Sequence, residues 1–377
     1  MWISGHHRQV AGLARGEPLG RAEAVDPDQG GEDGIAEPAG RRDQGKDDAH
    51  AGGGLRENAA ARQDARDPSV PRPPAILIGG PTASGKSALA LALAREFDGV
   101  IVNADSMQLY RELRVLSARP DAGDEAAAPH RLYGILPVST RGSAGTWRAM
   151  AVAEIEAAWA AGRRPIVVGG TGLYLRVLEA GIAPVPTIPD AVRAELRRAH
   201  AELGDLGLHA RLAARDPEAA ARLAPADTHR VLRALEVIEA TGRSLSAYQA
   251  AQAPPPELPC RRILLAPPRD LLAGRIDRRC EAMLAGGAID EVAAVLAAAP
   301  DPDLPARKAV GVPEIAALLA GELGRAAALA RFQQATRRYA KRQMTWFRHQ
   351  FAADLVLSAQ YSESQAERIF QFIRQHG

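Results

Sequence analysis

Short apolar runs alternate with longer amphipathic stretches from about residue 73 onward. The runs are continuous, which is typical of strands that are buried on both faces of a sheet. Strands are predicted at 75–80, 100–105, 165–170 and 261–267, and helices at 87–97, 146–161 and 271–285. Strands separated by helices predict a parallel α/β sheet with helices on both sides. In such sheets ligands bind at the carboxyl ends of the strands.

A different pattern occupies residues 184–259, where helical periodicity continues without a strand. Proline-rich segments flank this stretch on both sides and are typical of hinges. We therefore predict an all-helical insertion between two strands of the α/β core, which comprises residues 73–183 and 260–351. From Leu271 to the end the chain is predicted to be mostly helical, and residues 352–377 form a C-terminal tail.

Residues 1–72 are rich in Gly, Asp, Arg, Ala and Gln and contain hardly any aromatic or β-branched residues after Ile3. Such a composition cannot bury enough apolar surface to offset the entropy of ordering. We expect a disordered N-terminal extension, or a stretch that precedes the true translation start. A basic RNA-binding arm is the functional alternative, but acidic and basic residues are mixed in it.

Composition sets limits on the partners. The formal net charge of +2 is too small to predict nucleic-acid binding by itself, so a basic site must be local. The 2 cysteines form neither a disulfide framework nor a zinc site, which fits a reducing compartment. The sequence contains no run of about 18 apolar residues and no secretion signal. We expect a cytoplasmic monomer without a membrane span.

The first predicted strand ends in a phosphate-binding pattern, G-x-x-x-x-G-K-S, and a helix follows it. Glycines allow backbone N–H groups to turn toward an anion, and the helix N-terminus adds its positive dipole end. Lys86 supplies a charge for phosphate oxygens, and Ser87 supplies a hydroxyl for Mg²⁺. The whole loop is Gly80, Pro81, Thr82, Ala83, Ser84, Gly85, Lys86 and Ser87. The fold is thus predicted to be a P-loop NTPase-like parallel sheet flanked by helices.

Two further features carry candidate chemistry. Asp105 ends the second strand, where it can ligate magnesium, act as a general base or cap a following helix. The last predicted helix, 331–350, carries six bases within an arc of about 140° and no acid, which favours a polyanionic partner. Phe332, Tyr339 and Trp346 recur every seven residues on its other side and are predicted to be core anchors.

Five sequence motifs follow one another along the chain: GPTASGKS, NADSMQLY, GGTGLYL, HRVLRALEV and AKRQMTWFR. Their order and intervals resemble those of the bacterial tRNA dimethylallyltransferases from about Pro73 to Phe351. The resemblance implies transfer of a dimethylallyl group from dimethylallyl diphosphate to N6 of the adenosine 3′ of the anticodon, in tRNAs that read codons beginning with U. It also implies that the phosphate loop binds the allylic diphosphate rather than ATP, and it favours Asp105 as the general base.

The resemblance implies further site residues. Asp105, Ser106, Met107 and Gln108 are implied to line the pocket of the flipped base, and Thr171 to approach the reacting nucleotide. Contacts to tRNA are implied for Arg193, His229, Arg230, Val231, Leu232, Arg233 and Lys308. Arg338 and Arg342, on the basic face of the last helix, are further candidates for tRNA contact. Arg275 and Arg278 share a helix face, and one of them is expected to reach the diphosphate, with a surface ion pair as the alternative.

The chain departs from the family pattern in two places. His229 stands where the family has Gln, and KAVGVP at 308–313 replaces R-C-V-G-Y-R. Lys308 keeps the charge of the missing arginine but not its bidentate fork. Three other functions remain open: an adenylate isopentenyltransferase, a small-molecule P-loop kinase and a non-catalytic tRNA-binding module.

Overall fold

The computed structural model describes residues 72–255, 257–359 and 361–376. The prediction of a disordered extension at 1–72 therefore falls outside the described residues, except for Arg72.

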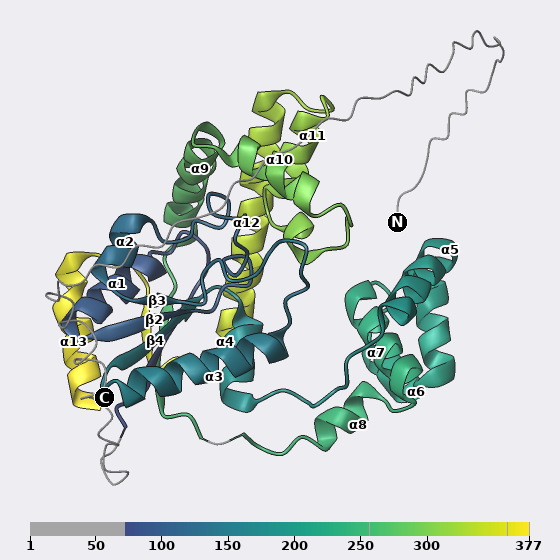
Figure 1. The fold of residues 1–377 in the computed structure, drawn as a ribbon, viewed down its shortest axis with the longest axis horizontal. Helices are drawn as coiled ribbons and strands as arrows, with labels where there is room; N and C mark the ends of the chain where they lie inside the picture. The colour runs from purple at the N-terminus through teal and green to yellow at the C-terminus, as the bar shows by residue number, and fades with distance from the viewer. Residues whose placement is uncertain (1–71, 256, 360, 377) are drawn as a thin grey trace, which may run out of the picture. The chain divides into compact units, whose positions relative to one another are not determined.

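A parallel sheet forms the centre of the fold, as predicted (Figure 1). Its strands are β1 (Ala75–Gly79), β2 (Gly99–Asn103), β3 (His130–Arg131), β4 (Arg164–Gly169), β5 (Cys260–Leu265) and β6 (Leu355–Leu357). They lie in the order β3-β2-β4-β1-β5-β6, and every neighbouring pair is parallel. The longer strands match the four predicted ones. The short edge strands β3 and β6 were not predicted.

Alternate residues of the strands enter two separate cores, one on each face of the sheet. Leu77 and Val167 face α3 (Ala144–Ala160), α4 (Gly172–Ala180) and the end of α12 (Arg325–Gln350). Ile76 and Ile166 face α1 (Lys86–Glu96) and α13 (Glu363–His376). Both faces are covered, which explains why these strands read as continuous apolar runs.

Between α4 and β5 the chain forms helices only. They are α5 (Asp190–Arg215), α6 (Pro217–Arg222), α7 (Thr228–Thr241) and α8 (Leu245–Ala250). Leu196, Leu208 and Leu235 belong to a core of their own within this segment. Gly204 interrupts α5 with a φ of 66°. The predicted boundaries of a separate domain at 184–259 stay a prediction.

The remaining helices belong to the α/β part of the chain. They are α2 (Ala122–Ala127), α9 (Arg269–Ala285), α10 (Ala288–Ala298), the 3₁₀ helix η1 (Pro305–Lys308) and α11 (Val312–Leu319). The long helix α12 lies beside α9 (Figure 1). Phe332 and Ile276 join the core between them. Both cysteines, Cys260 and Cys280, are free and buried. None of the described helices is long and apolar enough to cross a membrane.

Candidate active site

The phosphate loop, Gly80–Ser87, leaves β1 and turns into α1 through backbone conformations that favour glycine. Gly80 has a φ of 151° and Gly85 a φ of 95°, while Ala83 adopts a left-handed φ of 62°. A non-glycine residue in this region is strained, and strain of this kind gathers at ligand-binding sites. No side chain caps the first turn of α1, so its N–H groups are available to an anion.

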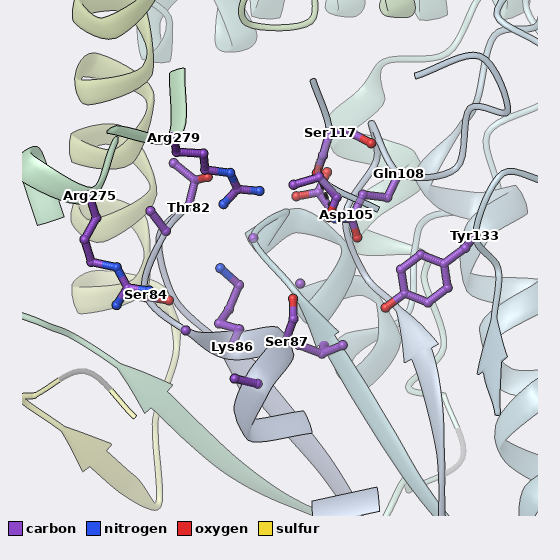
Figure 2. Close-up of a pocket in the computed structure, with 17 residues that line it drawn as sticks. Thr82, Ser84, Lys86, Ser87, Asp105, Gln108, Ser117, Tyr133, Arg275 and Arg279 are labelled. Carbon is purple, nitrogen blue, oxygen red and sulfur yellow. Dashed lines mark hydrogen bonds between the residues drawn. The ribbon is translucent and has the colours of Figure 1, made fainter. Parts of the chain in front are cut away.

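A cavity of about 330 Å³ lies above this loop and is called the first cavity here. Besides the loop, its charged and phenolic lining is Asp105, Tyr133, Arg275 and Arg279. Figure 2 shows Lys86 and Arg279 directed into the same space, from the phosphate loop and from α9. These cations make the first cavity suitable for a diphosphate rather than for an uncharged ligand.

Two buried polar atoms of the first cavity have no hydrogen-bond partner among the described residues. They are Ser84 Oγ and Arg275 Nη1. Leaving a buried donor unpaired costs free energy, so such atoms call for a ligand or water. Both can donate to phosphate oxygens, which is an independent sign of an anion site. Arg278, the other predicted candidate, is exposed and does not line this cavity.

Lys86 is held at the floor of the first cavity. Its ammonium donates a hydrogen bond of 2.6 Å to the Pro81 carbonyl oxygen of the same loop. Burial lowers the pKa of Lys86 to about 8, nearby Asp105 opposes this shift, and Arg279 adds to it. An arriving diphosphate would favour the charged form of Lys86.

Asp105 lies in a turn after β2 and does not cap a helix, so that alternative is wrong. The Met107 N–H donates 3.0 Å to Asp105 Oδ1, which forms a local turn. Asn103 fixes the base of this turn, because its amide donates 3.0 Å to the carbonyl oxygens of both Asp105 and Leu132. Burial raises the pKa of Asp105, and the Met107 hydrogen bond and the charge of Lys86 act against that rise. A carboxylate with a raised pKa is a stronger base.

A second cavity of about 240 Å³ adjoins the first. Thr82, Asp105 and Arg279 border both cavities. Its apolar lining is Leu113, Leu116, Met283, Val310 and Phe332, and its polar lining includes Lys308, Tyr339 and Arg342. Asp105 therefore stands where a group bound in the second cavity meets an anion bound in the first.

The predicted base-pocket residues divide between the two cavities. Ser106 and Met107 line the second cavity, whereas Gln108 lines the first. The Gln108 amide donates 2.9 Å to the Ser117 carbonyl oxygen and so holds the wall of the site. Thr171 lines neither cavity. Its Oγ accepts 3.0 Å from the Ser106 N–H and donates 3.2 Å to Ser106 Oγ, so it supports the turn beside Asp105.

The residues predicted to contact tRNA from the helical segment lie outside both cavities. Arg193 pairs with Asp190 at 3.2 Å, and Arg233 pairs with Glu236 at 3.2 Å. His229 and Arg230 are exposed, as an RNA-contacting surface requires. The prediction that Val231 contacts tRNA is wrong, because its side chain is fully buried in the core of α5–α7 and cannot touch RNA. Leu232 packs against the same core.

Helix α12 presents its bases on two sides. Arg342 borders the second cavity, with its guanidinium 5.7 Å from the centre of the Tyr339 ring. Arg338, Lys341 and Arg348 line a separate groove between α9 and α12. Arg337 is paired with Asp277, so the stripe is not entirely free of acids.

The aromatic residues of α12 have different roles from one another. Phe332 is a core residue, as predicted. Tyr339 also borders the second cavity but is only partly buried and belongs to none of the core clusters, so its prediction as a core anchor is wrong. Trp346 packs on Gly172 so closely that a Cβ there would overlap the indole.

Arg279 and Tyr133 are the site residues that the sequence analysis missed. Arg279 lies one helical turn after Arg275, so the i, i+4 spacing could have found it. Tyr133 follows the two-residue strand β3, which carries no pattern of its own. Burial raises the pKa of Tyr133, so its phenol stays protonated at neutral pH and can donate a hydrogen bond.

The donor set fits a magnesium ion that a ligand brings with it. Among the described residues no group of three or more His, Cys, Asp or Glu could hold a metal ion. Ser87 and Asp105 offer oxygen atoms at the first cavity. Mg²⁺ commonly keeps several waters and binds through one or two protein oxygens plus the phosphates of a substrate. Ser87 is the residue placed to complete such a shell.

Comparison with known proteins yields two family models that match this chain. The model described as IPP transferase matches residues 108–350, and the model described as isopentenyl transferase matches residues 74–139. A tRNA dimethylallyltransferase of Rhodospirillum centenum is 59% identical over 282 residues, which cover 74% of this chain and 90% of that protein. One of Rhodospirillum rubrum is 53% identical and covers 80% of this chain and 94% of that protein.

Among solved structures, the full-length tRNA isopentenylpyrophosphate transferase of Bacillus halodurans is similar with a TM-score of 0.59 and 31% identity. The match covers 81% of this chain and 96% of that one.

Proposed function

Because the chain belongs to the tRNA dimethylallyltransferase family, we propose that it transfers the dimethylallyl group of dimethylallyl diphosphate to N6 of the adenosine 3′ of the tRNA anticodon. Family membership confirms the resemblance found in the sequence and makes the chain a prenyl-group transferase. The names of its relatives favour tRNA as acceptor over free adenine nucleotides, and prenyl transfer over a kinase reaction.

The observation that carries this proposal is the position of Asp105 between the two cavities. The first cavity, with Lys86, Arg275 and Arg279, binds the diphosphate. The second, with its mixed apolar and polar lining, receives the adenine that has swung out of the anticodon loop. The allylic carbon then lies near Asp105, where donor and acceptor meet.

Each chemical change in the reaction has a residue beside it. The C–O bond to diphosphate breaks while the C–N6 bond forms, and charge builds on the departing oxygens. Lys86, Arg279 and the loop amides stabilise that charge. Asp105 accepts a hydrogen bond from the amine and takes the proton that N6 loses. The products are N6-dimethylallyladenosine and diphosphate.

Magnesium, when bound with the substrate, neutralises charge on the diphosphate oxygens. Ser87 would hold it through its hydroxyl. Thr171 supports the turn of the base rather than touching either cavity, which makes it a positioning residue.

Contacts to tRNA are proposed for polar side chains on α5, α7 and α12 and for Lys308. Arg193, His229, Arg230 and Arg233 would bind the anticodon stem-loop from the helical segment. Arg338 and Arg342 would bind it from α12. Lys308 lies at the second cavity and pairs with Asp303 at 2.9 Å, so tRNA competes with that ion pair. The expectation of a monomer stays a prediction.

One assay tests the proposal. The purified protein is incubated with dimethylallyl diphosphate carrying a label in its allyl group, or with γ-labelled ATP, and with unmodified tRNA or AMP as acceptor. We expect the allyl label in tRNA alone. Label in AMP but not in tRNA would indicate the adenylate isopentenyltransferase, and phosphate transfer from ATP would indicate the kinase. Absence of any transfer would leave only a tRNA-binding module.

A further inference from the structure

Helix α12 docks onto the active site through three side chains on one face. Gln343, Trp346 and Phe347 follow the i, i+3, i+4 spacing of a single helix face. Each packs against a glycine so closely that a Cβ on that glycine would overlap the side chain. Gly170 lies opposite Gln343, Gly172 opposite Trp346, and Gly79 opposite Phe347. Gly79 ends β1, Gly170 follows β4 and Gly172 begins α4, so the helix meets both strand ends that carry the site.

Gln343 is the polar member of this face and is almost completely buried, with 6% of its surface exposed. Its Oε1 accepts 2.8 Å from the Thr82 N–H. Its Nε2 donates 2.9 Å to the Gly170 carbonyl oxygen. A backbone N–H can only donate and a carbonyl can only accept, so the two partners fix the orientation of the amide. A neutral amide serves both partners, whereas a carboxylate or an apolar chain cannot.

The partners of Gln343 lead to the two halves of the reaction. Thr82 belongs to the phosphate loop and borders both cavities. Gly170 precedes Thr171, whose Oγ accepts from the Ser106 N–H next to Asp105. The Thr171 N–H also donates 3.2 Å to the Ala104 carbonyl oxygen on the other side of Asp105. One side chain therefore connects the loop that binds the leaving group to the turn that carries the base.

We propose that Gln343 is a positioning residue that sets the separation between the phosphate loop and the Asp105 turn. This proposal rests on the proposed prenyl transfer, because the separation matters only where a leaving group and a base act on one reacting centre. Gln343 lines neither cavity. It acts through Thr82 on one side and through Gly170 and Thr171 on the other.

The first test replaces the amide without shortening the chain. Gln343→Met removes both hydrogen bonds and keeps a similar length. A misplacement of about 1 Å can lower a rate by about 10²-fold, so we expect kcat to fall by about that factor. The KM values for tRNA and for dimethylallyl diphosphate should change much less, since the binding groups of both cavities remain. Gln350→Met is the matched control on the same helix, because Gln350 is exposed and only accepts from Arg176 at 3.1 Å.

The second test uses pH to separate positioning from general damage. In Gln343→Glu the ionised carboxylate cannot donate to the Gly170 carbonyl oxygen. The protonated acid can donate there and accept from the Thr82 N–H, which restores both bonds. Asp105, Lys86, Arg275 and Arg279 are the charged groups on the cavity that Gly170 borders. Burial and the Asp105 carboxylate raise the pKa of a carboxyl group introduced beside them, and the three cations lower it. Protonation restores both hydrogen bonds wherever that pKa lies.

We therefore compare kcat values as a ratio, that of Gln343→Glu to that of the unmodified protein at the same pH. This ratio should rise as the pH falls. A fold defect caused by the ionised, buried carboxylate would also ease as the pH falls, so thermal melting of each variant at each pH measures that defect and kcat is expressed per folded molecule. Normal kcat in Gln343→Met, or a ratio for Gln343→Glu that does not vary with pH, would overturn the proposal. An unmodified protein without prenyl transfer would instead overturn the proposed function, and this proposal with it.

Discussion

Asp105 is the residue on which the chemistry depends, and its replacement isolates the proton transfer. Asp105→Asn keeps the Oδ1 acceptor for the Met107 N–H, so the turn is expected to persist. The amide cannot take the proton from N6, and kcat should fall by about 10²–10⁴-fold while both substrates still bind. Rapid-quench kinetics and tRNA binding measure the two effects. The control is Asp98→Asn, which changes an exposed carboxylate paired with Arg163. Equal turnover in the two variants would show that Asp105 is not the base.

Lys86 gives the diphosphate site its own pH dependence. Burial lowers the Lys86 pKa to about 8, so the ammonium is present below that pH and is lost above it. Bound diphosphate stabilises the ammonium and raises its pKa, so affinity for pyrophosphate should decline as the pH rises through about 8. Lys86→Arg retains its charge over this range and should lack that decline. Calorimetric titration of both proteins across the range measures the difference, and identical pH profiles would contradict the assignment.

Single residues were predictable where a short stretch of chain determines its own geometry. The phosphate loop was found because its glycines, Lys86 and Ser87 lie within one turn between a strand and a helix. No helix that Asp105 could cap forms, because Leu109 is buried in the core beside β2 and Tyr110 in a neighbouring core. The N–H of Arg111 bonds the Leu136 carbonyl oxygen at 2.8 Å instead. Such a distant contact leaves no trace in local periodicity.

At the scale of elements, the two basic sides of α12 make separable predictions. Arg338→Gln and Arg342→Gln should each weaken tRNA binding. The slope of log affinity against log salt should flatten by about 0.7–0.9 for each lost phosphate contact. Arg337→Gln is the matched control on the same helix, because Asp277 already neutralises Arg337. Filter binding over a range of salt concentrations measures the slopes. If Arg337→Gln flattened the slope as much as the other two variants, the effect would be one of net charge only.

Elements were predictable in proportion to their length and burial. The strands β1, β2, β4 and β5 have 5 or 6 residues each and stand out as apolar runs. Strand β6 has 3 residues, of which only Leu357 is buried, and it forms because β5 offers it a partner. Strand β3 has 2 residues and pairs with β2 in the same way. A strand that exists only through its neighbour cannot be recognised from its own sequence.

At the scale of the whole molecule, the first residues should be separable from the enzyme. Among the described residues, those bordering the two cavities lie between Thr82 and Arg342, so we expect removal of residues 1–71 to leave kcat and both KM values unchanged. A cut after Pro74 is the contrasting variant. It also removes the ion pair of Arg72 with Glu156 at 2.7 Å, and the Pro73 carbonyl that accepts 2.9 Å from Trp159 Nε1.

An exposed ion pair contributes about 1 kcal/mol at most and a hydrogen bond about 0.5–1.5 kcal/mol, so the second cut should lower the thermal midpoint by a few degrees. Removal of residues 1–71 should leave the thermal midpoint unchanged. Steady-state kinetics and calorimetry on the full chain and both truncations measure these effects. A large loss of turnover on removing residues 1–71, with the midpoint unchanged, would show that the N-terminal stretch acts in the reaction or in tRNA binding.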